Sequence, residues 1–448
     1  MTFSYAWLNA DTLGIVKKSW VTNDGPTTIR MTVLDGMQNI LPPGITRRFQ
    51  NEYSTLGDGY KKNERIPGTT LALFSMSSLP TDKAEPNEAL STTTVWSAGL
   101  DDPVILLSSR QLREFRRHGS VTPEPETRGV RGAYFVCTHL EIEANEERCW
   151  YLVAEVNQDH AAVARLIQWL NANPNPGQFV EEEVKHSNEN LKKLVGASDG
   201  FQVTADVAND FRHCSNTVFN ILRGGIPLNN YLVERDDFLN YLQDTYQPLA
   251  AHYAEKLKKL PERVSIQRLK ALGVDDNDYR KLCLEYLPLT FGRRHGDPSR
   301  PWNFFSIDIK DEEGKRIYHY QGNWRDIFQN WEALAISFPE FLEGMIAKFV
   351  NASSADGYNP YRVFKTGFEW EELNPEDEWS NIGYWGDHQI IYLLRLLEMS
   401  CHYHPGKIKN WLNEAIFTYA NIPYRIKAYP QLIENPHDTI EYDFELDA

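Results

Sequence analysis

The N-terminal third of the chain consists of short apolar runs separated by turns. Within residues 27–36 and 133–144, apolar and polar side chains alternate with a period of two, as expected for strands with one buried face. Asn23-Asp24-Gly25 and Asp35-Gly36 have the composition of turns. Many short strands without intervening helices favour a sandwich. The pattern predicts an antiparallel β-sandwich over residues 1–157, with strands at 27–36, 70–78, 92–99, 103–109, 133–144 and 149–156.

Two helical patterns follow the predicted sandwich. They cover residues 161–172 and 181–197, and the breaker cluster Asn173-Pro174-Asn175-Pro176-Gly177 separates them. Neither pattern has a second helix of its own to pack on. We therefore expect a pair of linker helices over residues 158–203.

The remainder of the chain, residues 204–448, is predicted to be mostly helical. The stretch at 390–399 is apolar on nearly every face, which indicates burial in a large domain. Long loops at 288–323 and 353–386 are expected to carry function. No internal repeat supports a solenoid, so we expect a toroid of paired helices, although the predicted helices are too few to close such a ring. These helices are 205–223, 235–258, 278–287, 324–337, 339–352, 388–401 and 406–420.

Charge and composition restrict the classes of partner. The chain has 448 residues and a formal net charge of −16, so a polyanion would be repelled, and we expect neither a nucleic-acid nor a membrane partner. Five widely spaced cysteines without a CxxC pair favour reduced thiols. The N-terminus lacks the basic and apolar regions of a signal peptide, and no apolar run is long enough to span a membrane. We therefore predict a cytoplasmic protein.

Aromatic residues make up 12% of the chain, which is a composition suited to binding sugars. The faces of sugar rings pack on aromatic rings, while their hydroxyl groups need Asp, Asn, Gln or Arg as partners. The densest such group is residues 322–335, where Arg325, Gln329 and Glu332 share one helix face and Asp326 and Asn330 lie beside it. The alternative is an ordinary amphipathic helix with a solvated polar face, capped by Asn323.

Two later segments carry further candidate residues. Turn signals in residues 356–363 place Arg362 on a loop among aromatic residues. Residues 379–389 contain Trp385 and Asp387, and Asp387 could contact a ligand, cap the following helix, or do both.

Three other patterns are weaker. Arg294 and His295 could hold an anion such as phosphate, or belong to a surface loop that offsets the acidic body. Arg212, Asn216 and Asn220 form a polar stripe on one helix face, typical of a lined cavity or of a satisfied buried network. Cys401, His402 and His404 are close in sequence, but no second cluster accompanies them, so we predict no metal site. Nucleotide-binding and esterase motifs are absent from the sequence.

The order of these segments resembles the inverting phosphorylases that act on cellobiose and chitobiose. Those proteins have a β-sandwich, linker helices and an (α/α)6 barrel. Trp324, Arg325, Asp326 and Gln329 resemble the family motif in which Arg and Asp bind the glucosyl unit. Residues 358–362 and Asp387-His388 resemble later loop motifs of the family. The resemblance implies β-glucosidic bond phosphorolysis with inversion, inorganic phosphate as co-substrate, no other cofactor, and a homodimer.

One departure concerns the catalytic acid. The family uses an Asp at the end of a Trp-Asn-Asp motif, which is missing from this sequence, as is the phosphate-binding loop. Three explanations follow. The chain is a fragment of a longer enzyme, which we favour, since its acidic C-terminal tail is typical of a linker. Alternatively it is an inverting hydrolase that activates water with Glu369, Glu371 or Asp387, or a non-catalytic carbohydrate-binding protein.

The sequence thus predicts a multidomain β + α protein that binds an oligosaccharide or disaccharide. Its predicted parts are a sandwich at 1–157, linker helices at 158–203 and an incomplete toroid at 204–448. The catalytic residue is not assigned. The predicted substrate-binding residues are Arg325, Asp326, Gln329, Arg362, Asp387, Trp324 and Trp385.

Overall fold

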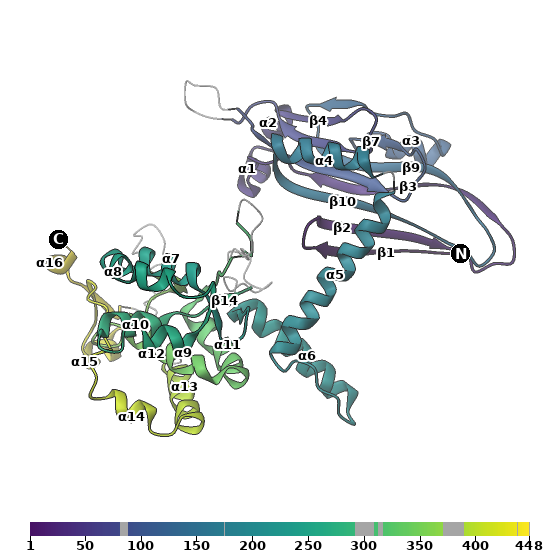
Figure 1. Cartoon of the computed structure of the whole chain (residues 1–448). Helices are drawn as coiled ribbons and strands as arrows, with labels where there is room; N and C mark the ends of the chain where they lie inside the picture. The colour runs from purple at the N-terminus through teal and green to yellow at the C-terminus, as the bar shows by residue number, and fades with distance from the viewer. Residues whose placement is uncertain are drawn as a thin grey trace. The chain divides into compact units, whose positions relative to one another are not determined.

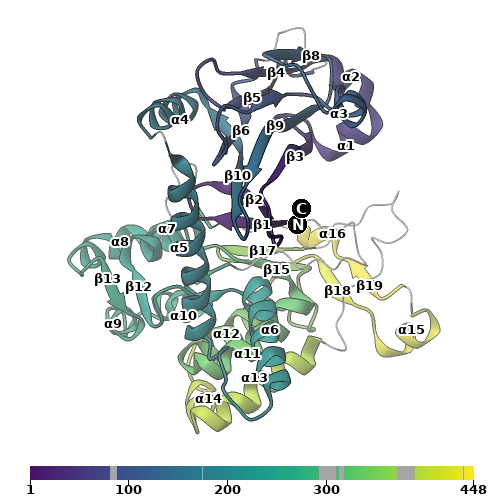
Figure 2. The ribbon, with the colours of Figure 1, turned by 90° about the vertical axis from the view of Figure 1, so that its right-hand side faces the viewer.

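The computed structural model describes residues 1–80, 88–173, 175–291, 309–311, 317–370, 389–436 and 438–447. The chain divides into two compact units, Met1–Leu191 and Lys192–Ala448. Figures 1 and 2 show a sheet-rich first unit and a mainly helical second unit. The predicted multidomain β + α class is confirmed.

The first unit contains two antiparallel sheets. The larger sheet has the strand order β1-β2-β10-β6-β5-β4-β8, and the smaller has the order β3-β9-β7. Val33 and Val136 of the smaller sheet share one buried cluster with Phe74, Val95 and Trp150 of the larger sheet. The strands are β1 (Thr2–Ala10), β2 (Gly14–Thr22), β3 (Ile29–Ile40), β4 (Lys61–Arg65), β5 (Ala72–Met76), β6 (Ser91–Ala98), β7 (Val104–Leu106), β8 (Glu126–Arg128), β9 (Gly132–Ile142) and β10 (Glu147–Asp159).

Asp35-Gly36, predicted as a turn, lies inside β3 and links the two sheets. The Asp35 carboxylate accepts hydrogen bonds from Ser19 at 2.7 Å and Trp150 at 2.9 Å, and it pairs with Lys17. A Cβ atom on Gly36 would lie 2.2 Å from the carbonyl oxygen of Tyr134 on β9. The turn prediction was wrong because Gly here allows close approach of a strand, and Asp serves as a buried acceptor.

Five helices complete the described part of the first unit. Trp169 of α4 and Phe179 of α5 pack around Trp96 on the larger sheet, with ring centroids 5.8 Å (Trp96–Trp169) and 4.9 Å (Trp169–Phe179) apart. Figure 1 shows α4 lying against the sheet. These two helices therefore pack on the larger sheet through the aromatic cluster around Trp96. The helices are α1 (Arg47–Glu52), α2 (Ser54–Gly59), α3 (Leu112–His118), α4 (His160–Ala172) and α5 (Pro176–Ala197).

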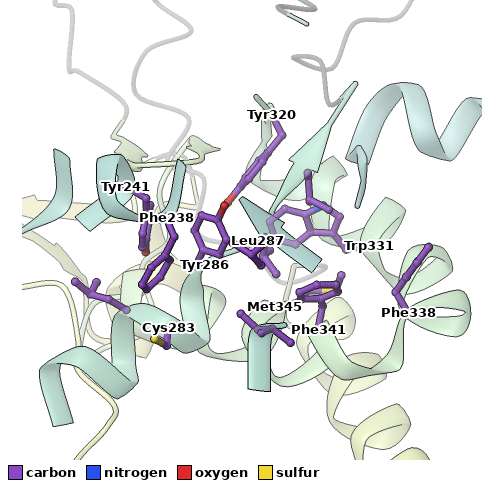
Figure 3. Close-up of a cluster of buried hydrophobic side chains, with 14 of the residues drawn as sticks. Phe238, Tyr241, Cys283, Tyr286, Leu287, Tyr320, Trp331, Phe338, Phe341 and Met345 are labelled. Atoms are coloured by element: carbon purple, nitrogen blue, oxygen red, sulfur yellow. The ribbon is translucent and has the colours of Figure 1, made fainter. Parts of the chain in front are cut away.

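The second unit is built on one large apolar core. Figure 3 shows part of this core, with Tyr286, Trp331 and Met345 gathered in one cluster. A closed (α/α)6 barrel is not confirmed within the described ranges. The helices are α6 (Val207–Gly224), α7 (Arg235–Thr245), α8 (Gln247–Lys258), α9 (Ile266–Ala271), α10 (Asn277–Glu285), α11 (Trp324–Ser337), the 3-10 helix η1 (Pro339–Phe341), α12 (Leu342–Ala352), α13 (Gln389–Tyr403), α14 (Lys407–Trp411), α15 (Tyr429–Glu434) and α16 (Phe444–Asp447).

Short antiparallel strand pairs connect these helices. β11 pairs with β14, β12 with β13, and β18 with β19, while β15, β16 and β17 form a three-stranded sheet. The acidic C-terminal segment, expected to be a linker, contains β19 of one pair. The strands are β11 (Ile226–Pro227), β12 (Leu232–Glu234), β13 (Arg263–Ser265), β14 (Leu289–Thr290), β15 (Gln321–Asn323), β16 (Arg362–Phe364), β17 (Gly367–Glu369), β18 (Tyr424–Ile426) and β19 (Ile440–Tyr442).

Three helix predictions differ from the structure. The helix predicted at 235–258 is broken at Tyr246 into α7 and α8, because Pro248 begins a new helix and lacks the N–H that would continue the first. Only Lys407–Trp411 of the predicted 406–420 is helical. The α13 helix buries Leu396, but Ile390 is 61% exposed, so the described surroundings of α13 do not enclose it on every face.

Candidate functional site

The predicted sugar-binding motif lies where β15 leads directly into α11. In the three-stranded sheet, Asn323 pairs with Arg362, and Arg362 in turn pairs with Glu369. The backbone N–H of Trp324 donates a hydrogen bond of 2.9 Å to the carbonyl of Tyr361. The first turn of α11 is therefore held beside the beginning of β16, and the structure brings together two segments separated by about forty residues of sequence.

The local sequence explains the tight entry into α11. A Cβ atom on Gly322 would lie 2.9 Å from the Cβ atom of Ile327, so a larger residue would push the strand away from the helix. Asn323 occupies the N-cap position, but its side chain makes no capping hydrogen bond, unlike the predicted cap. Asp326 lies in the first turn, where a negative charge interacts favourably with the helix dipole.

Trp324 is part of the core and is only 1% exposed. Its ring lies 4.7 Å from that of Phe328, 4.9 Å from that of Phe349 and 6.0 Å from that of Phe368, measured between centroids. Because protein aromatic rings surround it, this geometry does not fit the predicted sugar-stacking role. Its role in the described structure is to anchor the beginning of α11.

The other residues of the motif lie closer to solvent. Asp326 is partly exposed and Gln329 is exposed on α11. Arg325 belongs to the first turn of the helix, but its side chain lies outside the described part. Glu332, on the same predicted face, forms an ion pair of 3.2 Å with Arg395 of α13. The polar stripe therefore divides into a solvent-accessible beginning and a later part that contacts α13.

Arg362 is held in place by an ion pair. Its guanidinium lies 2.7 Å from the Glu369 carboxylate on the neighbouring strand, and the Arg362 side chain is 15% exposed. Glu369, considered as a hydrolytic carboxylate, is thus engaged by a cation. The remaining candidates Glu371, Trp385 and Asp387, and the basic pair Arg294 and His295, lie outside the described residues.

A buried lysine that was not predicted from the sequence contacts the three-stranded sheet β15-β16-β17. Lys348 of α12 is 2% exposed and donates a hydrogen bond of 3.2 Å to the carbonyl of Lys365 in the β16–β17 turn. Its ammonium lies 5.7 Å from the ring centroid of Tyr320 and 5.3 Å from that of Phe368. Burial lowers the pKa of Lys348 to about 8. A single Lys within the otherwise apolar stretch 344–349 was the available sequence signal.

A second ionic contact ties the same turn to the segment between β11 and β14. Lys365 pairs with Asp237 of α7, and Asp237 also accepts a hydrogen bond from Tyr286. Ile226 pairs with Thr290 and Pro227 pairs with Leu289, so the two ends of this segment meet. The two ends of the segment between β11 and β14 are therefore neighbours, and Asp237 within it contacts the β16–β17 hairpin that carries Arg362.

The described residues contain no group of three or more His, Cys, Asp or Glu side chains that could hold a metal ion. His404, part of the rejected metal cluster, lies 2.7 Å from the buried Glu343 carboxylate, which also binds Lys407 at 2.9 Å. In the same described ranges, no helix combines the length and apolar character that a membrane crossing requires.

Comparison with known proteins adds a family match for this segment. Residues 229–288 match the family model for glycoside hydrolase family 149 insertion domain 1. Among solved structures, a protein assigned as a kojibiose phosphorylase from the human microbiome is similar, with 10% identity and a TM-score of 0.24. That comparison covers 92% of this chain but 40% of the other, so this chain spans less than half of that protein's length. No curated protein sequence matches. Residues 229–288 are thus similar to a domain of a glycoside hydrolase family, which agrees with the predicted carbohydrate-active class of enzyme.

Proposed function

We propose that this chain is the substrate-binding portion of a glycoside phosphorylase-like enzyme. The observation that carries the proposal is the pairing of Asn323 with Arg362, which sets the Arg-Asp turn of α11 beside a second arginine. The match of residues 229–288 to a glycoside hydrolase family domain supports the same class of substrate. The expected ligand is a glucosyl-type ring of a disaccharide or oligosaccharide.

The proposed contacts follow from the chemistry of the side chains. A carboxylate such as Asp326 accepts hydrogen bonds from two sugar hydroxyls, while arginine donates in a planar fork. Arg362 is oriented by its ion pair with Glu369. Gln329, one turn after Arg325, adds an amide that can both donate and accept.

The reaction proposed is inverting transfer of a β-glucosyl group to inorganic phosphate, as in cellobiose phosphorylases. Such a transfer needs one general acid to protonate the leaving oxygen, with phosphate attacking from the opposite face. We assign the acid to no residue of this chain. Glu369 is a poor alternative for a hydrolytic base because its carboxylate is engaged by the Arg362 guanidinium at 2.7 Å.

The test combines binding with turnover. Titration with D-glucose and cellobiose, followed by ligand-observed NMR, is expected to give saturable binding that weakens by about 100-fold in Asp326→Ala, since a desolvated hydroxyl partner is lost. Asp278→Ala, which changes an exposed Asp in the first turn of α10, is the matched control. Unchanged affinity in a folded Asp326→Ala variant would remove this site.

Turnover then separates the possible activities. Any product released from cellobiose is expected to be glucose 1-phosphate and to require phosphate, and the chain by itself is expected to bind the sugar with little or no turnover, because the acid is assigned to none of its residues. Glucose release that does not depend on phosphate would identify a hydrolase. Sugar binding without product in the full-length protein would favour a non-catalytic binding protein.

A further inference from the structure

A second pocket lies at the other end of α11, away from the Arg-Asp turn. It has a volume of about 260 Å³ and is formed by the α5–α6 connection, one face of α6 and the last turn of α11. Figure 2 shows α6 running beside α11. Asp326 and Ser337 are eleven residues apart on α11, which corresponds to about 16 Å along a helix. A single sugar ring cannot reach from one end to the other.

The polar stripe of α6 lines this pocket. Asn216, Thr217 and Asn220 face the cavity, together with Ser337 of α11. Within the described residues, the side chains of Asn216, Thr217, Asn220 and Ser337 have no hydrogen-bond partner. Of the two alternatives for this stripe, a lined cavity or a satisfied network, the structure therefore favours the cavity. Arg212, the first member of the stripe, does not line it.

Ser198 adds a buried hydroxyl to the same pocket. Its Oγ atom is shielded from solvent and makes no hydrogen bond to any described group. An unsatisfied buried hydroxyl is unfavourable, and a rotation of the Ser198 side chain toward the pocket would let a ligand hydroxyl satisfy it. The pocket thus presents two amides and three hydroxyls, from residues of the two helices and the connection, that are available to a ligand.

The charge of the lining indicates a neutral ligand. No Lys or Arg occurs among the described lining residues, and the only ionisable ones are Asp199 and His213. His213 is engaged with the backbone carbonyl of Asp199 at 2.7 Å. Ile221 and Leu334 supply apolar walls. Uncharged donors and acceptors over an apolar floor suit a polyhydroxylated ring, whereas an anion such as phosphate would lack a cationic partner.

We propose that this pocket is a second carbohydrate-binding site, which holds one neutral sugar ring apart from the Arg-Asp turn. The volume lies just below the ~300 Å³ at which typical ligand pockets begin, which matches a single ring. The choice of glucose as the sugar rests on the function proposed above. The site would retain one end of an oligosaccharide or a released monosaccharide on the same helix as the first site.

The experiment isolates this pocket by disabling the first site. D-Glucose is titrated into Asp326→Ala and into Asp326→Ala combined with Asn216→Ala and Asn220→Ala, and binding is followed by ligand-observed NMR. We expect residual glucose binding in the single variant and at least a tenfold loss of affinity in the triple variant. Asn209→Ala, an amide on α6 outside the pocket, is the matched control and should keep the residual binding.

Ala333→Phe, which fills the pocket from α11, provides a second route if the triple variant does not fold. Residual binding that persists unchanged in folded triple and Ala333→Phe variants would overturn the proposal, as would an Asp326→Ala variant that binds no glucose at all. The two proposals fail differently. Full binding in Asp326→Ala that disappears with the two Asn substitutions would retain this pocket and remove the first site.

Discussion

Replacing Lys348 by methionine is expected to stabilise the protein near neutral pH. Burial lowers the pKa of Lys348 to about 8 from its ordinary value of 10.5. Each pKa step corresponds to ~1.4 kcal/mol, so holding this ammonium charged in the core costs ~3 kcal/mol. Methionine has a similar length, fills the same space and carries no charge. After subtracting ~1 kcal/mol for the lost hydrogen bond to Lys365, a net gain of ~2 kcal/mol remains.

The stabilisation expected from Lys348→Met depends on pH. Below pH 8 the lysine is protonated in both folded and unfolded chains, so the folded state carries the full cost. Between pH 8 and about 10.5, the unfolded chain still binds the proton that the folded protein has released, and the free energy of unfolding rises with pH. Above that window the wild type no longer carries the cost, so the advantage of Lys348→Met should disappear.

Urea denaturation at pH 7 and at pH 10.5 measures this difference directly, since ionisations common to both proteins cancel in the comparison. Lys256→Met is the matched control, because Lys256 also lies over a tyrosine ring, at 4.6 Å from its centroid, but is exposed. It should change stability by less than ~0.5 kcal/mol. A Lys348→Met variant that is less stable at pH 7, or equally stabilised at both pH values, would refute the reasoning.

Three further predictions concern buried contacts. Gly36→Ala should destabilise by ~3 kcal/mol, because its Cβ atom would meet the facing β9 backbone at 2.2 Å, whereas Gly59→Ala meets no atom within 4 Å; equal midpoints in thermal melts would contradict this. Asp35→Asn should cost ~3–5 kcal/mol in urea denaturation, since it leaves the buried Lys17 ammonium without its counter-ion; a loss below 1 kcal/mol would argue against that pair. Burial alone would raise the pKa of Glu343, but hydrogen bonds from Lys407, His404 and Ser400 outweigh burial, so the pKa lies below its ordinary value. Its stabilising contribution is therefore present above the unfolded pKa of ~4.3 and lost on further acidification, so Glu343→Gln should show a shallower loss of stability below pH 4.5, and identical acid profiles would reject this role.

The elements with strong local patterns could be predicted from sequence. β3 and β9 alternate with a period of two, and α4 and α5 are separated by a cluster of helix-breaking residues, so their existence and type follow from composition. The Asp35-Gly36 pair shows the limit of this approach. The same dipeptide serves as a turn when exposed and as an inter-sheet contact when a neighbouring strand needs space, and only the tertiary partner distinguishes the two.

The candidate site was predicted in part for a similar reason. The Arg-Asp turn was identified by residue type, but its neighbour Arg362 depends on the pairing of β15 with β16, which three-residue strands do not reveal in sequence. Trp324 is predicted from sequence to contact the sugar, whereas its burial follows from three phenylalanines, two of which lie on other elements. Side chains of one helix can thus be placed from sequence, while contacts between distant segments cannot.

The antiparallel pairing of β11 with β14 has a consequence for how substitutions in the segment between them act on the rest of the helical unit. The chain departs and returns through one pair of antiparallel strands, so the 61-residue stretch between Pro227 and Leu289 has neighbouring ends. Its helices share one apolar core with α11 and α12, so a change within the stretch also changes the packing of those helices. The contact of Asp237 with Lys365 would then pass any such change to the hairpin that carries Arg362. Variation in this stretch would in this way reach Arg362, a residue proposed above to contact the sugar, without any substitution in the proposed site itself.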